Sequence, residues 1–555
     1  MSSEEATVSE NQDGHSSYLD DTGKYKGIRA WIFSTDHKRI GILYLIALLS
    51  WFAIGVTLGF LIRLELLTPG KTIVDPQAYN AFFTLHGVIM LFLFVIPGLP
   101  AVFGNFFLPI MLGAKDVAFP RLNLLSWYLY MLGGFLVILA IVLPGGAPDT
   151  GWTFYIPYSV RTSTNMIFAL TAVFILGFSS ILTGLNFLTT IHRMRAPGMG
   201  WFKMPLFAWS LYATGWIQIL ATPIIGITLL LVIVERVFHV GIFDPALGGD
   251  PIMFQHMFWI YSHPAVYIMA VPAMGVISEI LPVFAKRTIF GYRFIAFSSL
   301  AIALFGSLVW AHHMFAVGMS DQAEFIFSLL TFLVAIPSAI KVFNWTATLY
   351  KGSISLDPPM LYALAAIFLF SIGGLTGIIQ GTLSVDIQIT DTAFIVGHIH
   401  YVVFGITGVG IFAALHYWLP KMIGRMYNHK VAKVAFWIFF TGFNVLYFPM
   451  FVMGWLGMPR RYYDYLPEYT IYHQISTVGS WIMITGMIIM FYNLIKSVKY
   501  GKKIDAKSVW GYGETLEWTV ATPPPHENFD EIPAVTDGPY EYKFNDEPIL
   551  EEEGS

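Results

Sequence analysis

The chain of 555 residues contains no cysteine. This absence excludes disulfide bonds, thiolate nucleophiles, iron–sulfur clusters and metal sites with thiolate ligands. Any metal that the chain binds must therefore be held by histidine, aspartate, glutamate, tyrosine or methionine side chains.

Charge is also scarce: 12% of the residues are charged, against roughly 25% in soluble domains. Hydrophobic residues make up 56% of the chain, which is typical of an integral membrane protein. The formal net charge of −4 says little about partners, but the absence of a basic patch argues against nucleic acid. Residues 1–35 are polar and lack a basic segment followed by a short apolar run, so we expect no cleaved signal peptide.

Twelve apolar stretches are each long enough to cross ~30 Å of hydrocarbon, which requires about 20 helical residues. They lie near Ile40–Ile62, Ala81–Leu108, Leu124–Leu143, Asn165–Thr189, Phe207–Ile233, Phe254–Pro282, Phe294–Val317, Ala323–Leu349, Met360–Ile379, Ala393–Trp418, Val434–Trp455 and Ile475–Ile495. The sequence therefore predicts an all-α integral membrane protein with twelve transmembrane helices.

The distribution of lysine and arginine predicts the orientation of these helices. Basic residues are frequent in the N-terminal segment, in the even-numbered connections and in the C-terminal segment. The odd-numbered connections are poor in them, except for Arg460 and Arg461. Both termini should therefore be cytoplasmic. We expect a polar N-terminal segment (1–35), a twelve-helix domain (36–498) and a polar cytoplasmic tail (499–555).

Six of the fifteen histidines lie well inside predicted helices, at similar depths in the outer half of the membrane. They are His86, His263, His312, His313, His398 and His400. Ionisable residues inside a membrane are costly and usually functional. One alone could simply be bonded to a neighbouring helix, but six at one level favour ligands of heme iron and copper, which imidazole binds well.

The spacing of these histidines divides them into groups. His398 and His400 point to opposite flanks of their helix, about 200° apart, so each can ligate a separate group. His312 and His313 are about 100° apart and can converge on one ion together with His263. His86 remains as the partner of one of the tenth-helix pair. The count gives three imidazoles on copper, two on a low-spin heme and one on a high-spin heme.

Several strings in the sequence resemble the motifs of heme–copper oxidases, specifically subunit I of cytochrome c oxidase. They are Trp259-Ile-Tyr-Ser-His-Pro-Ala-Val-Tyr267, Trp310-Ala-His-His-Met-Phe315, Gly397-His-Ile-His-Tyr401, Gly457-Met-Pro-Arg-Arg-Tyr462, Gly113-Ala-Lys-Asp-Val-Ala-Phe-Pro-Arg121 and Thr515-Leu-Glu-Trp-Thr519. The resemblance covers about residues 30–530 and makes 36–498 the catalytic domain. It implies a terminal oxidase that reduces dioxygen to water and translocates protons.

The resemblance also implies roles for individual residues. His86 and His400 would ligate a low-spin heme, His398 a high-spin heme, and His263, His312 and His313 one copper ion; heme A is the expected heme type. Tyr267 would be joined covalently to His263 and would supply an electron and a proton for O–O cleavage. Arg460 and Arg461 would pair with heme propionates, and Arg63 would contact the formyl group of the low-spin heme.

Two proton routes are implied as well. Asp116, with Asn105 and Asn123, would form the mouth of one route at the inner ends of the second and third helices. Lys341 lies inside the eighth span, where a lysine is expensive, and would carry the second route with Ser278 and Ser338.

The sequence departs from the common pattern at three places. Ala265 stands where the family usually has a glutamate, and the preceding Tyr261 and Ser262 resemble a subgroup that uses a Tyr-Ser pair instead. Thr390 replaces a histidine of a magnesium site, which weakens the case for Asp391 as a magnesium ligand. Ile399 replaces a phenylalanine, so no aromatic ring is required there for electron transfer between hemes.

The resemblance implies several partners: a subunit II that carries a copper centre, a subunit III, cytochrome c and dioxygen. A respiratory supercomplex is a further candidate, and the expected location is a bacterial cytoplasmic membrane. Three alternatives remain at this point. A quinol oxidase would have polar residues where Ala78 and Ala81 stand. A nitric oxide reductase would lack Tyr267 and Lys341, and a secondary transporter would not explain six histidines at one depth.

Overall fold

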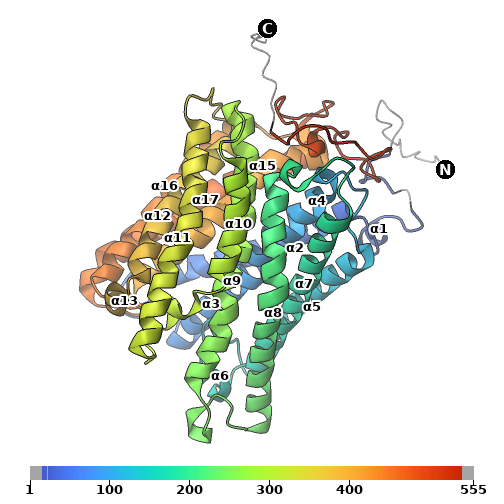
Figure 1. Cartoon of the computed structure of the whole chain (residues 1–555). Coiled ribbons are helices and arrows are strands. Elements are labelled where there is room, and N and C mark those ends of the chain that lie inside the picture. The colour runs from blue at the N-terminus through green and yellow to red at the C-terminus, as the bar shows by residue number, and fades with distance from the viewer. Residues whose placement is uncertain (1–15, 22, 541–555) are drawn as a thin grey trace, which may run out of the picture.

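The computed structural model describes residues 16–21 and 23–540, and this part of the chain is almost entirely helical (Figure 1). The α-helices are α1 (Ile28–Ile32), α2 (His37–Glu65), α3 (Pro76–Val88), α4 (Asn105–Met111), α5 (Pro120–Val142), α6 (Tyr158–Arg161), α7 (Met166–Arg193), α8 (Leu206–Phe238), α9 (Pro251–Ala285), α10 (Tyr292–Gly306), α11 (Asp321–Leu349), α12 (Pro358–Gly381), α13 (Leu383–Ile389), α14 (Ala393–Ile399), α15 (Val409–Ile423), α16 (His429–Trp455) and α17 (Thr470–Tyr500).

The remaining elements are short. Three π-helical segments continue longer helices: η1 (Ile89–Val95), η2 (Gly98–Gly104) and η6 (His400–Gly408). The 3₁₀ turns are η3 (Trp201–Lys203), η4 (Pro245–Leu247), η5 (Trp310–Met314), η7 (Pro467–Tyr469) and η8 (Leu516–Trp518). The strands β1 (Arg425–Met426) and β2 (Lys502–Lys503) pair antiparallel and attach the start of the tail to the end of α15.

Side chains at the helix ends define where the long helices begin. Asp36, Asp75 and Asp250 each accept a hydrogen bond from a backbone N–H of the first turn of α2, α3 and α9. Ser320 does the same for α11 and Asn428 for α16. These caps satisfy donors that have no partner within the helix, which matters most at the edge of an apolar medium.

Eleven helices of the described chain are long and apolar enough to cross a membrane, and they coincide with eleven of the twelve predicted stretches. The seventh stretch, Phe294–Val317, behaves differently. Its helix α10 has 15 residues, about 22 Å at the helical rise. The chain leaves the helix at Gly306, whose backbone lies so close to the Tyr267 ring that a Cβ atom would come within 2.4 Å of it.

The prediction that His312 and His313 belong to a continuous helix was therefore wrong. They lie on the 3₁₀ turn η5, which is separated from the end of α10 by three residues. A tighter turn changes the angle between successive side chains, so the helical geometry assumed for this pair does not apply.

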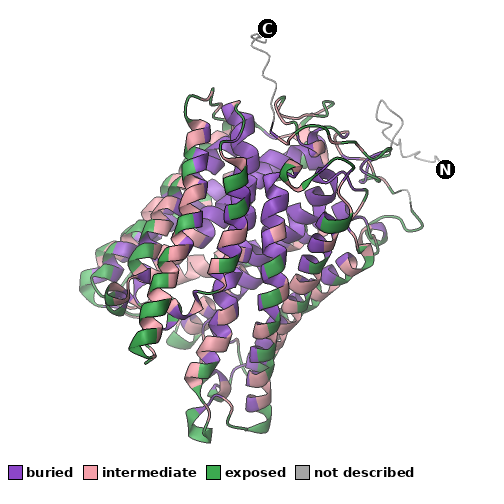
Figure 2. Cartoon of the chain, viewed as in Figure 1, coloured by how far each residue is buried: buried purple, intermediate pink, exposed green. Residues whose placement is uncertain are grey.

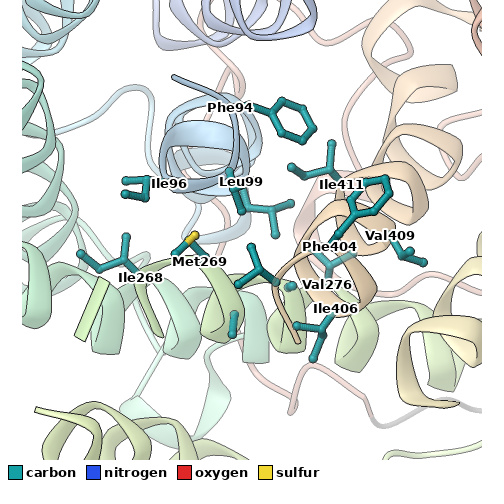
Figure 3. Close-up of a cluster of buried hydrophobic side chains, with 14 of the residues drawn as sticks. Phe94, Ile96, Leu99, Ile268, Met269, Val276, Phe404, Ile406, Val409 and Ile411 are labelled. Atoms are coloured by element: carbon teal, nitrogen blue, oxygen red, sulfur yellow. The ribbon is translucent and has the colours of Figure 1, made fainter. Parts of the chain in front are cut away.

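The core lies along three membrane-spanning segments that the other spans enclose (Figure 2). The most apolar windows of Pro76–Met111, Pro251–Ala285 and Ala393–Ile423 are buried over 83%, 100% and 94% of their residues, against 50% or less for the other eight spans. Their apolar side chains meet in one cluster, where Leu99, Met269 and Ile411 represent the three crossings (Figure 3). Four of the six intramembrane histidines come from these enclosed crossings.

The tail from Gly501 to Tyr540 lies on the end of the bundle that also carries α1 and α4 (Figure 1). Ser17 and Pro525 form a β-bridge, so the described parts of the two terminal segments lie side by side. The buried amine of Lys421 donates hydrogen bonds to the carbonyls of Lys507 and Val520 and to the Thr522 hydroxyl. The tail is therefore bound to the helices through buried polar contacts.

Candidate metal and heme sites

Three histidines bring their ring nitrogens together in one group. His263 Nδ1 lies 3.0 Å from His313 Nε2, which lies 3.1 Å from His312 Nε2. They form the group of metal-ligating side chains in the described residues whose ligand atoms all lie within 4.8 Å of one another. Nitrogens bound to one metal at about 2.0–2.1 Å would be separated by roughly 3.4 Å, so this group needs only a small expansion to hold an ion.

Hydrogen bonds around His312 determine which of its nitrogens carries the proton. The Thr331 hydroxyl donates to the Phe327 carbonyl at 2.7 Å, so at its 2.9 Å contact with His312 Nδ1 it must accept. His312 Nδ1 is therefore protonated, and in the neutral ring Nε2 presents a lone pair to the other two histidines. A metal ion held by the three histidines would bind this lone pair, and the contact of Nδ1 with Thr331 would fix the orientation of the ring.

The surrounding aromatic rings hold the trio in place. Trp259 stacks on the His313 ring with centroids 3.8 Å apart and an interplanar angle of 13°. Tyr267 lies one helical turn after His263 on α9, and its ring centroid is 5.0 Å from that of His263. His263 Nε2 is buried and has no hydrogen-bond partner among the described residues. This nitrogen is thus available on the side away from the trio.

His86 and His400 face each other across a cavity. Their rings are nearly parallel, at 22°, with centroids 6.4 Å apart. A metal held between two imidazoles at about 2.0–2.1 Å from each nitrogen requires ring centroids on the order of 6 Å apart. His86 Nδ1 donates to the Gly55 carbonyl and His400 Nδ1 to the Val396 carbonyl, so both neutral rings present Nε2 lone pairs.

The cavity between these rings has a volume of about 290 Å³ and is largely apolar. Gly59 lines it at a point where a Cβ atom would come within 3.0 Å of the His86 ring, so a larger residue would push the ring out of position. Tyr447, which also lines the cavity, stacks on the His400 ring with centroids 4.3 Å apart. His86 and His400 would hold a heme here through their Nε2 atoms, against the largely apolar wall of the cavity.

His398 lies on α14, two residues before His400, and is not among the residues that line the His86–His400 cavity. Its Nδ1 lies 3.0 Å from the Thr376 hydroxyl, which itself donates to the Gly373 carbonyl at 2.9 Å. The same reasoning gives a protonated Nδ1 and a free Nε2. His398 is close enough to His263, His312 and His313 for electrostatic interaction with each of them. The π-helical segment η6 begins at His400, so the helix changes its winding between the two histidines, as is frequent at functional sites.

Two arginines lie at one end of the cavity, in the connection after α16. Arg461 has a positive φ of 67°, and its guanidinium lies over Gly151, where a Cβ atom would come within 2.8 Å of it. Burial lowers the pKa of Arg461 to about 10. Arg460 donates two hydrogen bonds to Asp391, at 2.9 and 2.6 Å. Asp391 is thus the ion-pair partner of an arginine, and a magnesium ion would compete with that arginine for its carboxylate.

Arg63 lines the same cavity together with His473, a residue that the sequence analysis did not select. Arg63 donates to His473 Nδ1 at 3.2 Å and to the His473 carbonyl at 3.0 Å. Since arginine has no acceptor, His473 Nδ1 must accept, and the neutral ring then carries its proton on Nε2. Arg63 Nε and His473 Nε2 are both buried without a partner among the described residues, which leaves two donors for an oxygen-bearing group.

The residues predicted for the first proton route lie near the tail. Burial raises the pKa of Asp116 to about 7, the nearby Asp36 carboxylate adds to this, and a hydrogen bond from the Val117 N–H opposes it. Asn105 Oδ1 and both side-chain polar atoms of Asn123 are buried without partners among the described residues. Such atoms are normally satisfied by ordered water, which fits a hydrated path.

This polar region continues into the bundle. The Ser126 hydroxyl donates to the Asn123 carbonyl, the Ser179 hydroxyl to the Ser126 carbonyl, and Tyr44 lies within 3.0 and 3.2 Å of the two hydroxyls. Ser179 also lines a cavity of about 30 Å³, enough for at least one water molecule. Tyr261 and Ser262 are buried on α9, and the Ser262 hydroxyl has no partner among the described residues.

Lys341 is buried inside α11, and its contacts differ from the expected set. Its amine donates to the Ser299 hydroxyl at 2.8 Å and to the Ile295 carbonyl at 3.1 Å, both on α10. Ser278 instead donates to the Met274 carbonyl and accepts from Trp345. Ser338 donates to the carbonyl one turn before it. Ser299 was missed because a serine in an apolar helix carries no distinguishing signal.

Comparison with known proteins identifies a family. Residues 39–482 match the family described as cytochrome c and quinol oxidase polypeptide I. The chain is 42% identical over 511 residues to cytochrome c oxidase subunit 1 of Thermostichus vulcanus, with 92% of each chain covered. It is 41% identical over 510 residues to the probable cytochrome c oxidase subunit 1-alpha of Streptomyces coelicolor, covering 91% of this chain and 88% of the relative.

The fold also has a counterpart among solved structures. It is similar to a heme-copper terminal oxidase dimer determined by cryo-EM, with a TM-score of 0.67, 21% identity and 84% of each chain covered. At that identity the likeness concerns the fold alone.

Proposed function

Because the chain belongs to the family of cytochrome c and quinol oxidase polypeptide I, we propose that it is the catalytic subunit of a terminal respiratory oxidase. It passes electrons from cytochrome c to dioxygen, forms water and couples this reaction to proton translocation. The observation that carries the proposal is the group of three imidazoles whose ligand nitrogens converge close to His398.

The donor atoms suit two hemes and one copper ion, with heme A as the heme type. His86 and His400 would hold the low-spin heme, His398 the high-spin heme, and His263, His312 and His313 the copper. Bound there, these groups would supply electron transfer and the binding and reduction of dioxygen. The protein fixes their ligands: Gly55, Val396, Thr376 and Thr331 accept from the Nδ1 atoms and keep the Nε2 lone pairs directed inward.

Tyr267 is the proton and electron donor of this site. Its ring lies beside that of His263, whose Nε2 has no hydrogen-bond partner among the described residues. A covalent bond from this Nε2 to the tyrosine ring would replace an N–H and a ring C–H, give up two protons and two electrons to the dioxygen substrate, and leave His263 Nδ1 available for copper. In the cavity between His86 and His400, Arg461 and Arg460 would bind heme propionates, and Arg63 a formyl oxygen. Arg460 would then share its charge between a propionate and Asp391.

Two routes supply protons. One enters at Asp116, passes Asn105 and Asn123 and reaches the core through the polar residues around Tyr44. Tyr261 and Ser262 complete it as hydrogen-bond relays, because Ala265 cannot carry a proton. The other route passes through Lys341 toward Tyr267, with Ser338 and Ser278 along its path.

Membrane placement follows from the charge distribution. We assign twelve crossings, with Tyr292–Met314 completing the seventh, and place both termini in the cytoplasm of a bacterial cell. Residues 499–555 are the cytoplasmic tail and 1–35 the N-terminal segment. Because the described chain offers no cysteine-based copper centre, electrons arrive through a subunit II that carries one. Subunit III and a supercomplex are further proposed partners.

The purified complex tests this function directly. The optical spectrum should show one low-spin and one high-spin heme, and carbon monoxide should bind only the latter. Oxygen uptake should depend on reduced cytochrome c rather than on quinol. Faster oxidation of quinol than of cytochrome c would show that quinol, and not cytochrome c, is the electron donor. A spectrum without heme would refute the function.

A further inference from the structure

The amine of Lys341 is held by one face of the neighbouring helix α10. Its shorter contact is with the Ser299 hydroxyl, at 2.8 Å; the longer is with the Ile295 carbonyl, at 3.1 Å. That carbonyl also accepts from the hydroxyls of Ser298 at 2.8 Å and Ser299 at 3.2 Å. A carbonyl oxygen has only two lone pairs, so these three side-chain donors compete for the Ile295 carbonyl. The Ser299 oxygen is the acceptor that best serves the lysine.

The same face of α10 meets the site tyrosine. Gly306 lies against the Tyr267 ring and follows Ser299 by seven residues, almost two full turns. Positions seven apart share one face of a helix and are separated by about 10 Å along the axis. Between them α10 presents the buried apolar residues Ile302 and Ala303. A proton that leaves Lys341 for Tyr267 must therefore cross an apolar interval.

We infer that Ser299 is a positioning residue that anchors the Lys341 amine two helical turns from Tyr267 and holds it ready to receive a proton. This inference rests on the proposed route through Lys341. Both acceptors of the amine are neutral, so the contact can break as the lysine side chain moves toward Tyr267. An ion pair in the same place would be far more expensive to break inside the membrane.

Four variants of the purified oxidase complex test the anchor. Lys341→Met removes the route, Ser299→Ala removes the anchoring hydroxyl, and Ser299→Thr restores it. Ser298→Ala is the matched control, because Ser298 is buried next to Ser299 and bonds the same Ile295 carbonyl. The measurement is the rate of anaerobic reduction of each heme after mixing with excess reductant, followed by its absorption.

Electrons placed on a buried site require compensating protons. The rate at which the high-spin heme is reduced should therefore depend on proton delivery through Lys341. We expect Ser299→Ala to slow its reduction by about 3- to 10-fold, the effect of one hydrogen bond. Reduction of the low-spin heme, Ser298→Ala and Ser299→Thr should all remain near the parental rates. A general packing defect would not separate the two hemes in this way.

The outcomes are distinct. If Lys341→Met reduces the high-spin heme at the parental rate, the proposed route fails and the anchor fails with it. If Lys341→Met is slow but Ser299→Ala is not, or if Ser298→Ala is equally slow, only the anchor is refuted. Should Ser299→Ala not assemble, Ser299→Val replaces it. A slow valine variant beside a normal threonine variant supports the anchor, and equal rates refute it.

Discussion

Given the proposed copper site, we expect the hydroxyl of Thr331 to control its copper affinity, because it fixes the proton of His312 on Nδ1. Thr331→Val keeps the shape of the side chain but removes this oxygen, so His312 Nδ1 loses its acceptor at 2.9 Å. The ring can then rotate or place its proton on the nitrogen that faces the metal. Removing such a supporting contact typically lowers metal affinity by about 10- to 100-fold, which corresponds to ~1.4–2.8 kcal/mol.

Copper competition measures this effect. The purified variant is titrated with a copper chelator, and copper per heme iron is determined by mass spectrometry. Heme iron serves as the internal standard because its proposed ligands do not contact Thr331. Thr346→Val on the same helix is the control, since among the described residues its hydroxyl bonds the Val342 carbonyl, on an exposed face.

Thr331→Ser should retain the parental copper affinity because it keeps the oxygen. His312→Ala should lose the copper altogether while most heme remains. An unchanged affinity in Thr331→Val would refute the role of the hydroxyl in orienting His312. Full copper occupancy in His312→Ala would refute the ligand assignment itself.

Further expectations concern the low-spin heme and the first proton route. His86→Ala should abolish the low-spin bands while carbon monoxide still binds the high-spin heme; surviving bands would require another axial ligand. Tyr261→Phe should reduce turnover and proton pumping severely with unchanged heme spectra, and adding Ala265→Glu should restore part of both; normal pumping in the single variant would discard the relay. Burial raises the pKa of Asp116 to about 7, so it is protonated below that pH. Its infrared carboxylic-acid band should disappear as the pH rises through about 7 and be missing in Asp116→Asn; a band that persists at pH 9 or is already lost at pH 5 would contradict this environment.

The amino-acid sequence determined the class and the chemistry of this protein. Long apolar stretches with few charges can only be helices in a membrane, since each backbone group must find its partner within its own segment. The absence of cysteine left histidine as the main metal ligand, and six intramembrane histidines were identifiable because each is costly there. Spacing predicted a grouping into three, two and one but left open which tenth-helix histidine pairs with His86. The structure brings the ligand atoms of His263, His312 and His313 within 4.8 Å of one another and sets His86 opposite His400.

Contacts between helices were decided by the tertiary structure. His312 and His313 meet His263 from a 3₁₀ turn and not from a helix, because α10 ends where Gly306 meets Tyr267. Local spacing cannot reveal such an ending, which depends on a side chain from another helix. In the same way, Ser299 and His473 became significant only through their contacts with Lys341 and Arg63, residues 42 and 410 positions away in the chain. Periodicity records which face of a helix is apolar, whereas the partner of a single polar atom is fixed only when the helices pack.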